Sequence, residues 1–226
     1  MSMLVERPPA RPPAGRHAAG RVPPPPPPTG GGDDGPREPS PGRPLLDNVR
    51  LAMMFFISAE VMFFAGLVSS FLVLRSSAAV WPPPFQPRLP VAVTGLNTLV
   101  LLASSVTMAA AGRSLAAGDG RGLTRRLGAT AALGAVFLAV QGYEWVELVR
   151  FGLTLSSGVY GTTFYTLIGT HGAHVLGALV WVLVTLGLTA RGGFAGRWTG
   201  VARACAIYWH FVVALWPILY VAVYLA

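Results

Sequence analysis

The sequence is poor in charge and in cysteine, and it contains no lysine at all. Only 12% of its 226 residues are charged and 53% are hydrophobic, a balance too apolar for an ordinary soluble domain. One cysteine, Cys205, excludes a disulfide framework and a thiolate metal cluster within the chain. We interpret Cys205 as a small buried apolar residue. These shortages indicate a helical membrane protein.

The basic residues are all arginine, and they leave a net charge of +8. They lie at the ends of apolar segments rather than on a soluble basic face, so we expect no nucleic acid partner. The sequence also has no glycine-rich phosphate loop after a strand, no serine or cysteine triad and no strand periodicity. It therefore indicates an all-α protein without a familiar soluble catalytic motif.

The first 46 residues are rich in proline and include the run PPPPPP at 23–28. Such a segment cannot build an apolar core, and it lacks the compact apolar region of a signal peptide. We predict a disordered Pro/Gly/Arg-rich tail over 1–46 and a membrane domain over 47–226.

Five apolar segments follow the tail, and each is long enough to cross a hydrocarbon core of about 30 Å as a helix. We predict a polytopic bundle of five transmembrane helices, at about 48–75, 91–112, 123–149, 159–189 and 202–225. Turn-forming or charged stretches separate them, at 81–90, 112–126, 150–158 and 191–197. Small residues four apart predict close helix contacts, at Gly66 and Ser70, Gly128 and Ala132, and Ala173 and Gly177.

The distribution of arginine predicts the orientation, because cytoplasmic segments carry the excess of positive charge. Seven arginines lie before residue 51, and the four connections in order carry two, four, one and three. We expect a cytoplasmic N-terminus and an outer C-terminus, in the cell membrane of a bacterium.

Ionisable side chains inside a membrane are costly, at about 2.5–3.5 kcal/mol on insertion scales, so those that occur carry information. The predicted spans hold an intramembrane polar cluster of Glu60, Glu144, His171, His174 and His210. At about 1.5 Å per residue, Glu60 and the three histidines fall at a similar depth, while Glu144 lies nearer the outer side. Glu147, beside Arg150, is interpreted as an interfacial charge.

Three roles stay open for this cluster: a hydrogen-bonded structural network, a metal site and a proton-active group. We expect Glu60 to be buried against protein, within direct or one-water reach of a histidine on the fourth or fifth helix. We predict no catalytic residue, cofactor-binding residue or metal ligand in the chain.

Seven motifs in order along the chain resemble subunit III of the haem-copper terminal oxidases, over about 48–226. They are AEVMFFAG at 59–66, WPPP at 81–84, LNTLVLLASS at 96–105, QGYEW at 141–145, GVYGTTFY at 158–165, HGAHVLGAL at 171–179 and YWHFV at 208–212. By this resemblance the chain is a short, five-helix form that lacks the first two of seven helices.

The resemblance implies a non-catalytic subunit of a cytochrome c oxidase, which reduces oxygen to water with proton translocation. Subunit III of that family carries no haem or copper; these lie in partner subunits. It packs against subunit I, and is associated with bound phospholipid, with durability of subunit I during turnover and with proton uptake. Glu60 matches the family's intramembrane glutamate, which reacts with carbodiimide, and the other four cluster residues match its recurrent polar positions. Subunits I and II and membrane phospholipid are the expected partners.

Two positions depart from the family pattern: Val213 stands where an acid is common, and Ala59 where a serine precedes the glutamate. Val213 removes a partner for a neighbouring histidine or arginine, so an accessory subunit of a quinol oxidase or nitric oxide reductase is the alternative. A proton- or ion-coupled transporter predicts inverted repeats, which an odd number of spans does not favour. A structural assembly factor is a further alternative.

Overall fold

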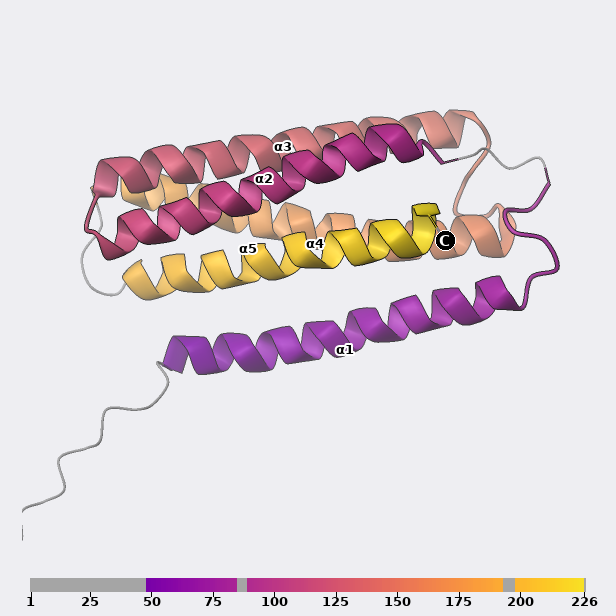
Figure 1. Cartoon of the computed structure of the whole chain (residues 1–226), viewed down its shortest axis with the longest axis horizontal. Coiled ribbons are helices and arrows are strands. Elements are labelled where there is room, and N and C mark those ends of the chain that lie inside the picture. Colours follow the sequence, from indigo (N-terminus) through magenta and orange to yellow (C-terminus); the bar gives the residue numbers. More distant parts are fainter. Residues whose placement is uncertain (1–47, 85–88, 193–197, 226) are drawn as a thin grey trace, which may run out of the picture. The chain divides into compact units, whose positions relative to one another are not determined.

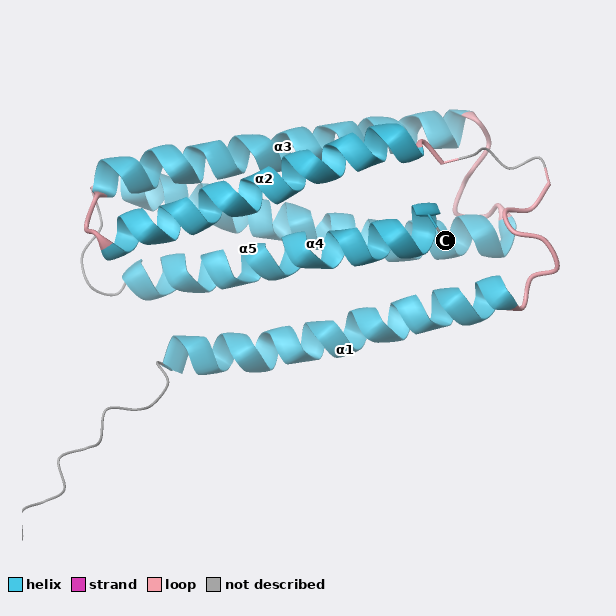
Figure 2. Cartoon of the chain, viewed as in Figure 1, coloured by secondary structure: helices cyan, strands magenta, loops and turns pink. Residues whose placement is uncertain are grey.

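The computed structural model describes residues 48–84, 89–192 and 198–225, and within them it is built of helices (Figure 2). The elements are α1 (Asn48–Ser76), α2 (Val91–Ala116), α3 (Gly120–Arg150), α4 (Gly158–Ala190), α5 (Trp198–Tyr220) and a final π-helical turn (Val221–Leu225). The predicted tail, 1–46, lies outside the described residues. In the described part, five helices are long and apolar enough to cross a membrane, which confirms the predicted fold class.

Successive helices run antiparallel (Figure 1). Helices α2, α3, α4 and α5 form a four-helix bundle in which each helix packs against two of the others. α2 packs on α3, α3 on α4, α4 on α5, and α5 returns to α2, while α1 lies along α4 and α5. One end of the bundle therefore holds the start of α1, the turn between α2 and α3, and the start of α5. The opposite end holds the loop between α3 and α4 and the C-terminal turn.

The stretch 112–126, predicted as a loop, is mostly helical, and this prediction was wrong. α2 continues to Ala116 and α3 already begins at Gly120, so the turn is only three residues long. Gly118 adopts φ +70°, a conformation that favours glycine, and the Asp119 carboxylate accepts a hydrogen bond from Gly122 N at 2.8 Å. A glycine C-terminal to α2 and an N-cap aspartate let both helices extend beyond the apolar segments.

The small-residue pairs do not mark close helix contacts. A Cβ placed on Gly66, Gly128 or Gly177 meets no atom within 4 Å among the described neighbours. A close approach occurs instead at Gly134, where a Cβ would lie 2.5 Å from Trp209 Cη2. A four-residue spacing alone does not reveal which face of an alanine- and glycine-rich helix meets a neighbour.

α1 is the least enclosed helix. Its buried residues, Met53, Phe64 and Phe71, lie on one face, and Glu60 shares that face because it follows Met53 by seven positions and precedes Phe64 by four. The other faces are apolar and exposed, with Phe55 at 70% and Met62 at 76%. The one charged residue in the middle of α1 thus points toward the rest of the bundle.

Candidate functional site

Glu60 of α1 meets His174 of α4. Glu60 Oε2 lies 3.1 Å from His174 Nε2, and the two side chains are 16% and 22% exposed. The contact is not aligned as a hydrogen bond, and Glu60 Oε2 has no hydrogen-bond partner among the described residues. Glu60 is therefore largely buried against protein and in direct reach of a histidine on the fourth helix, as we expected.

The hydrogen bonding of His174 orients its ring toward Glu60. His174 Nδ1 lies 2.7 Å from the carbonyl oxygen of Thr170, and a carbonyl only accepts, so Nδ1 carries a hydrogen. In a neutral ring with that tautomer, Nε2 is a lone-pair acceptor facing a carboxylate oxygen. The contact with Thr170 therefore orients Nε2, rather than Nδ1, toward the Glu60 carboxyl group.

His171 lies one turn earlier on the same face of α4, but its surroundings are aromatic. Its ring stacks on Trp216 with centroids 5.0 Å apart and meets Phe64 edge-on at 6.4 Å. The side chain is fully buried, and neither ring nitrogen has a hydrogen-bond partner in the described part of the chain. The Phe64 ring also meets the His174 ring edge-on, with centroids 5.0 Å apart, so Phe64 packs against both imidazoles.

His210 of α5 contacts α2 rather than Glu60. Its Nδ1 is 2.6 Å from Ser105 Oγ, and on the preceding residue Trp209 Nε1 donates to Ser104 Oγ at 3.1 Å. Two helical turns further, Trp216 Nε1 donates to Thr98 Oγ1 at 2.9 Å. These hydroxyl groups were missed in the sequence, although serine and threonine within an apolar helix are the signal for such interhelical bonds.

Glu144 of α3 forms a separate polar group near the opposite end of the bundle. Its carboxylate accepts from Thr94 Oγ1 at 2.9 Å and from Gln141 Nε2 at 3.1 Å, and it is 5% exposed. Gln141 also donates to Tyr224 OH at 3.4 Å. Thr94, Gln141 and Tyr224 were missed; Gln141 inside an apolar span was the available signal.

The structure thus divides the predicted cluster into distinct groups. It brings Glu60 and His174 together, places His171 beside them in an aromatic enclosure, and joins His210 and Glu144 to other partners. Glu147, at the end of α3, pairs with Arg150 at 2.7 Å on the exposed surface, as predicted.

The described residues do not assemble a metal site with three protein ligands. They contain no group of three His, Cys, Asp or Glu side chains that could hold a metal ion. His174 and His210 are engaged by Thr170 and Ser105, and the enclosure of His171 between two aromatic rings leaves it no converging ligands.

Comparison with known proteins agrees with the family resemblance of the sequence motifs. The sequence profile of the family described as cytochrome c oxidase subunit III matches residues 42–226. The cytochrome c oxidase subunit 3 of Synechocystis sp. is 37% identical over 175 residues, which cover 76% of this chain and 73% of that protein. The probable cytochrome c oxidase subunit 3 of Nocardia farcinica is 38% identical, over 78% of this chain and 87% of its own length.

A third relative belongs to the same family. The cytochrome c oxidase subunit 3 of Sus scrofa is 37% identical over 183 residues, which cover 78% of this chain and 69% of that protein. The family profile over residues 42–226 includes the helices that carry Glu60, Glu144 and His174. The chain is a multi-pass membrane protein and belongs to the cytochrome c oxidase subunit III family.

Proposed function

We propose that the chain is the non-catalytic subunit III of an aerobic respiratory cytochrome c oxidase, in which subunits I and II carry the haem and copper. The family match supports membership of such a complex. The subunit would stabilise subunit I during turnover and contact membrane phospholipid, with its N-terminus in the cytoplasm and the tail, 1–46, outside the membrane domain.

The observation that carries a role in proton uptake is the Glu60–His174 pair. Both side chains are ionisable and lie within membrane-spanning helices, and they are 16% and 22% exposed. α1 lies at the edge of the bundle, so a partner subunit packed against α1 would approach the pair. We infer that the pair passes protons toward the uptake path of subunit I.

Purification of the tagged chain in mild detergent tests membership of the oxidase. We expect haem bands in the visible spectrum, and subunits I and II in the mass spectrum of the same preparation. Recovery of a quinol oxidase or nitric oxide reductase subunit instead would support the alternative suggested by Val213, which is a buried core residue at 2% exposure. A colourless preparation without these partners would overturn the proposal.

The variant Glu60→Gln tests the proton role, because it keeps the shape of the side chain and removes its ionisable group. We expect proton uptake during single turnovers of the purified complex to slow severalfold, while the haem content stays unchanged. Glu147→Gln is the matched control, since Glu147 is a partly exposed carboxylate at the end of α3 that pairs with Arg150. Equal rates for Glu60→Gln and the unmodified complex would exclude the proton role and leave membership of the oxidase intact.

A further inference from the structure

The contact between Glu60 and His174 leaves one buried oxygen atom without a hydrogen-bond donor. Glu60 Oε2 is enclosed by protein, and no group among the described residues donates to it. His174 Nε2 lies 3.1 Å away, but the contact is not aligned as a hydrogen bond. A carboxyl oxygen inside a membrane costs free energy when it has no donor, so we searched the neighbouring helices for one.

A phenol group lies beside the pair on α5. Tyr208 is 8% exposed, and its ring contacts one aromatic ring from each of three helices. The ring centroids lie 5.6 Å from Phe56 of α1, 5.9 Å from Trp181 of α4 and 6.3 Å from Phe211 of α5 itself. Tyr208 therefore occupies the junction at which α1, α4 and α5 meet.

The Tyr208 phenol and the Glu60 carboxyl group lie at adjoining levels of this junction. Phe56 precedes Glu60 by four residues on α1, and Trp181 follows His174 by seven on α4, so each pair shares one helix face. The ring of Tyr208 thus packs about one to two helical turns from the Glu60–His174 pair, toward the end where α1 begins. The phenol and the carboxyl group are close enough to interact electrostatically.

The hydroxyl group of Tyr208 forms no hydrogen bond with the described part of the chain. Two other tyrosines near the C-terminus do form such bonds. Tyr220 donates to the carbonyl oxygen of Val91 at 2.9 Å, and Tyr224 accepts from Gln141 at 3.4 Å. A buried tyrosine hydroxyl group usually has a partner. At the junction of the three helices, an unpaired donor therefore lies beside an unpaired acceptor.

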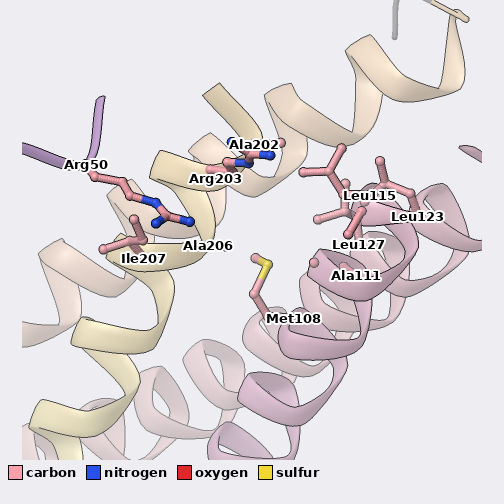
Figure 3. A pocket seen from close by; sticks show the side chains of 12 residues that line it. Arg50, Met108, Ala111, Leu115, Leu123, Leu127, Ala202, Arg203, Ala206 and Ile207 are labelled. Carbon is pink, nitrogen blue, oxygen red and sulfur yellow. The ribbon is translucent and has the colours of Figure 1, made fainter. Parts of the chain in front are cut away.

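Space for water lies at the same level of α5. A pocket of about 340 Å³ opens at the end of the bundle where α1 and α5 begin, and Ala206 and Ile207 line it together with Arg50 (Figure 3). Tyr208 directly follows Ile207 along α5. A buried water molecule makes about two to four hydrogen bonds, and the Tyr208 hydroxyl group and Glu60 Oε2 offer two of them. One water molecule between these groups satisfies both.

We propose that Tyr208 is a positioning residue of the Glu60–His174 site, and that its phenol donates a hydrogen bond to Glu60 Oε2 through one water molecule. Histidine reaches the carboxyl group from α4 and the phenol reaches it from α5, so the two hold it between them. Because Tyr208 lies toward the end where α1 begins, it orients the carboxyl group toward that end. This inference deepens the proposed proton role of Glu60 and rests on it for its effect on proton uptake.

Other polar groups along these helices are engaged elsewhere or lie farther away. At about 1.5 Å per residue, Arg50 lies roughly 15 Å from Glu60 along α1. Ser58 Oγ donates to a carbonyl oxygen of its own helix at 2.8 Å, and His210 Nδ1 is held by α2 at 2.6 Å. These groups therefore do not replace Tyr208 as the donor.

The variant Tyr208→Phe tests the contact, because it removes the hydroxyl group and keeps the ring. The complete complex is treated with dicyclohexylcarbodiimide, a hydrophobic reagent for carboxyl groups, and the rate of modification at Glu60 is measured by mass spectrometry of peptides. We expect the rate to rise severalfold, because the lost hydrogen bond frees an oxygen that attacks the reagent. Tyr220→Phe is the matched control on the same helix, since its hydroxyl group donates to Val91, and it leaves the rate unchanged.

Proton uptake during single turnovers of the complex gives a second measure. We expect Tyr208→Phe to slow uptake severalfold. The double variant Glu60→Gln, Tyr208→Phe is expected to be no slower than Glu60→Gln alone, because a positioning residue acts through the group that it positions. Haem content is recorded for every variant, so a loss of assembly is recognised separately.

Three results overturn the inference. Unchanged modification of Glu60 together with unchanged proton uptake in Tyr208→Phe shows that the phenol does not contact Glu60. An equal rise in modification for Tyr220→Phe shows a general loosening of α5, and additive slowing in the double variant shows that Tyr208 acts independently of Glu60. If Glu60→Gln leaves proton uptake unchanged, the proposed proton role fails, and the modification rate alone then decides whether Tyr208 contacts Glu60.

Discussion

At the scale of single residues, the two neighbouring histidines of α4 have opposite surroundings. His171 is fully buried without a hydrogen-bond partner in the described structure, whereas His174 is held by Thr170 and faces Glu60. A buried polar group without a partner costs free energy, and a buried carboxylate that loses its partner costs more. The same substitution at the two positions should therefore have different effects on stability.

We predict that His171→Leu changes the free energy of unfolding by no more than about 1 kcal/mol, because lost stacking on Trp216 is offset by removal of an unsatisfied polar group. His174→Leu should destabilise the chain by about 2 kcal/mol or more, because it leaves Glu60 unpaired. Denaturation of the purified chain in sodium dodecyl sulfate, followed by tryptophan fluorescence, measures both. An equal loss in the two variants would show that His171 has a partner in the protein.

Glu144 supports a second prediction at this scale. Thr94→Val removes a hydroxyl group that lies 2.9 Å from the buried carboxylate and keeps the shape of the side chain, so we expect a loss of about 1–3 kcal/mol in the free energy of unfolding. Thr163→Val is the control, since Thr163 Oγ1 donates to the Val159 carbonyl of its own helix at 2.7 Å. The same denaturation assay applies. A loss for Thr163→Val as large as that for Thr94→Val would contradict the role of the carboxylate contact.

The pairing of Glu60 with a histidine was predictable, and the surroundings of Glu144 were not. Counting residues along a helix gives the depth of a side chain, and depth places Glu60 and His174 at one level. Depth does not say which neighbouring helix a side chain faces. The contact of Glu144 with Thr94 depends on the packing of α3 against α2, which only the three-dimensional structure reveals.

At the scale of helices, the number and order of the spans followed from apolar length, because a membrane helix satisfies its backbone internally and must cross a fixed thickness. The ends of α2 and α3 did not follow from it. Within 112–126 both helices continue beyond the apolar segments. At the membrane interface the charged side chains of these turns stay in water, so the extension buries no charge. The contact between α3 and α5 at Gly134 was equally hidden among many small residues.

This contact gives a prediction about helix packing. Gly134→Ala places a Cβ 2.5 Å from Trp209 Cη2, and the indole is held by Ser104 on its other side, so it cannot shift freely. We expect a loss of about 1–3 kcal/mol in the free energy of unfolding. Gly128→Ala on the same helix meets no atom and should be neutral or stabilising by up to about 1 kcal/mol. Thermal unfolding by circular dichroism compares them; destabilisation by Gly128→Ala alone would contradict this packing.

At the scale of the whole molecule, charge is distributed unequally between the two ends of the bundle. Among the described arginines, two lie at the end that holds the loop between α3 and α4, Arg75 and Arg150. The others lie at the end that holds the turn between α2 and α3: Arg50, Arg113, Arg121, Arg125, Arg126, Arg191 and Arg203. This asymmetry carries the predicted orientation, because cytoplasmic segments hold the excess of positive charge.

The orientation is testable because the chain has a single cysteine, Cys205, which is buried at 2% exposure. In a Cys205→Ala background, Ala117→Cys reports on the turn between α2 and α3, and Ser156→Cys on the loop between α3 and α4; both positions are exposed. We expect an impermeant maleimide to label Ser156→Cys on intact cells and Ala117→Cys only after permeabilisation. The unlabelled Cys205→Ala chain is the control. The reverse pattern would place the arginine-rich end outside the cell and would contradict the orientation predicted from the arginine distribution.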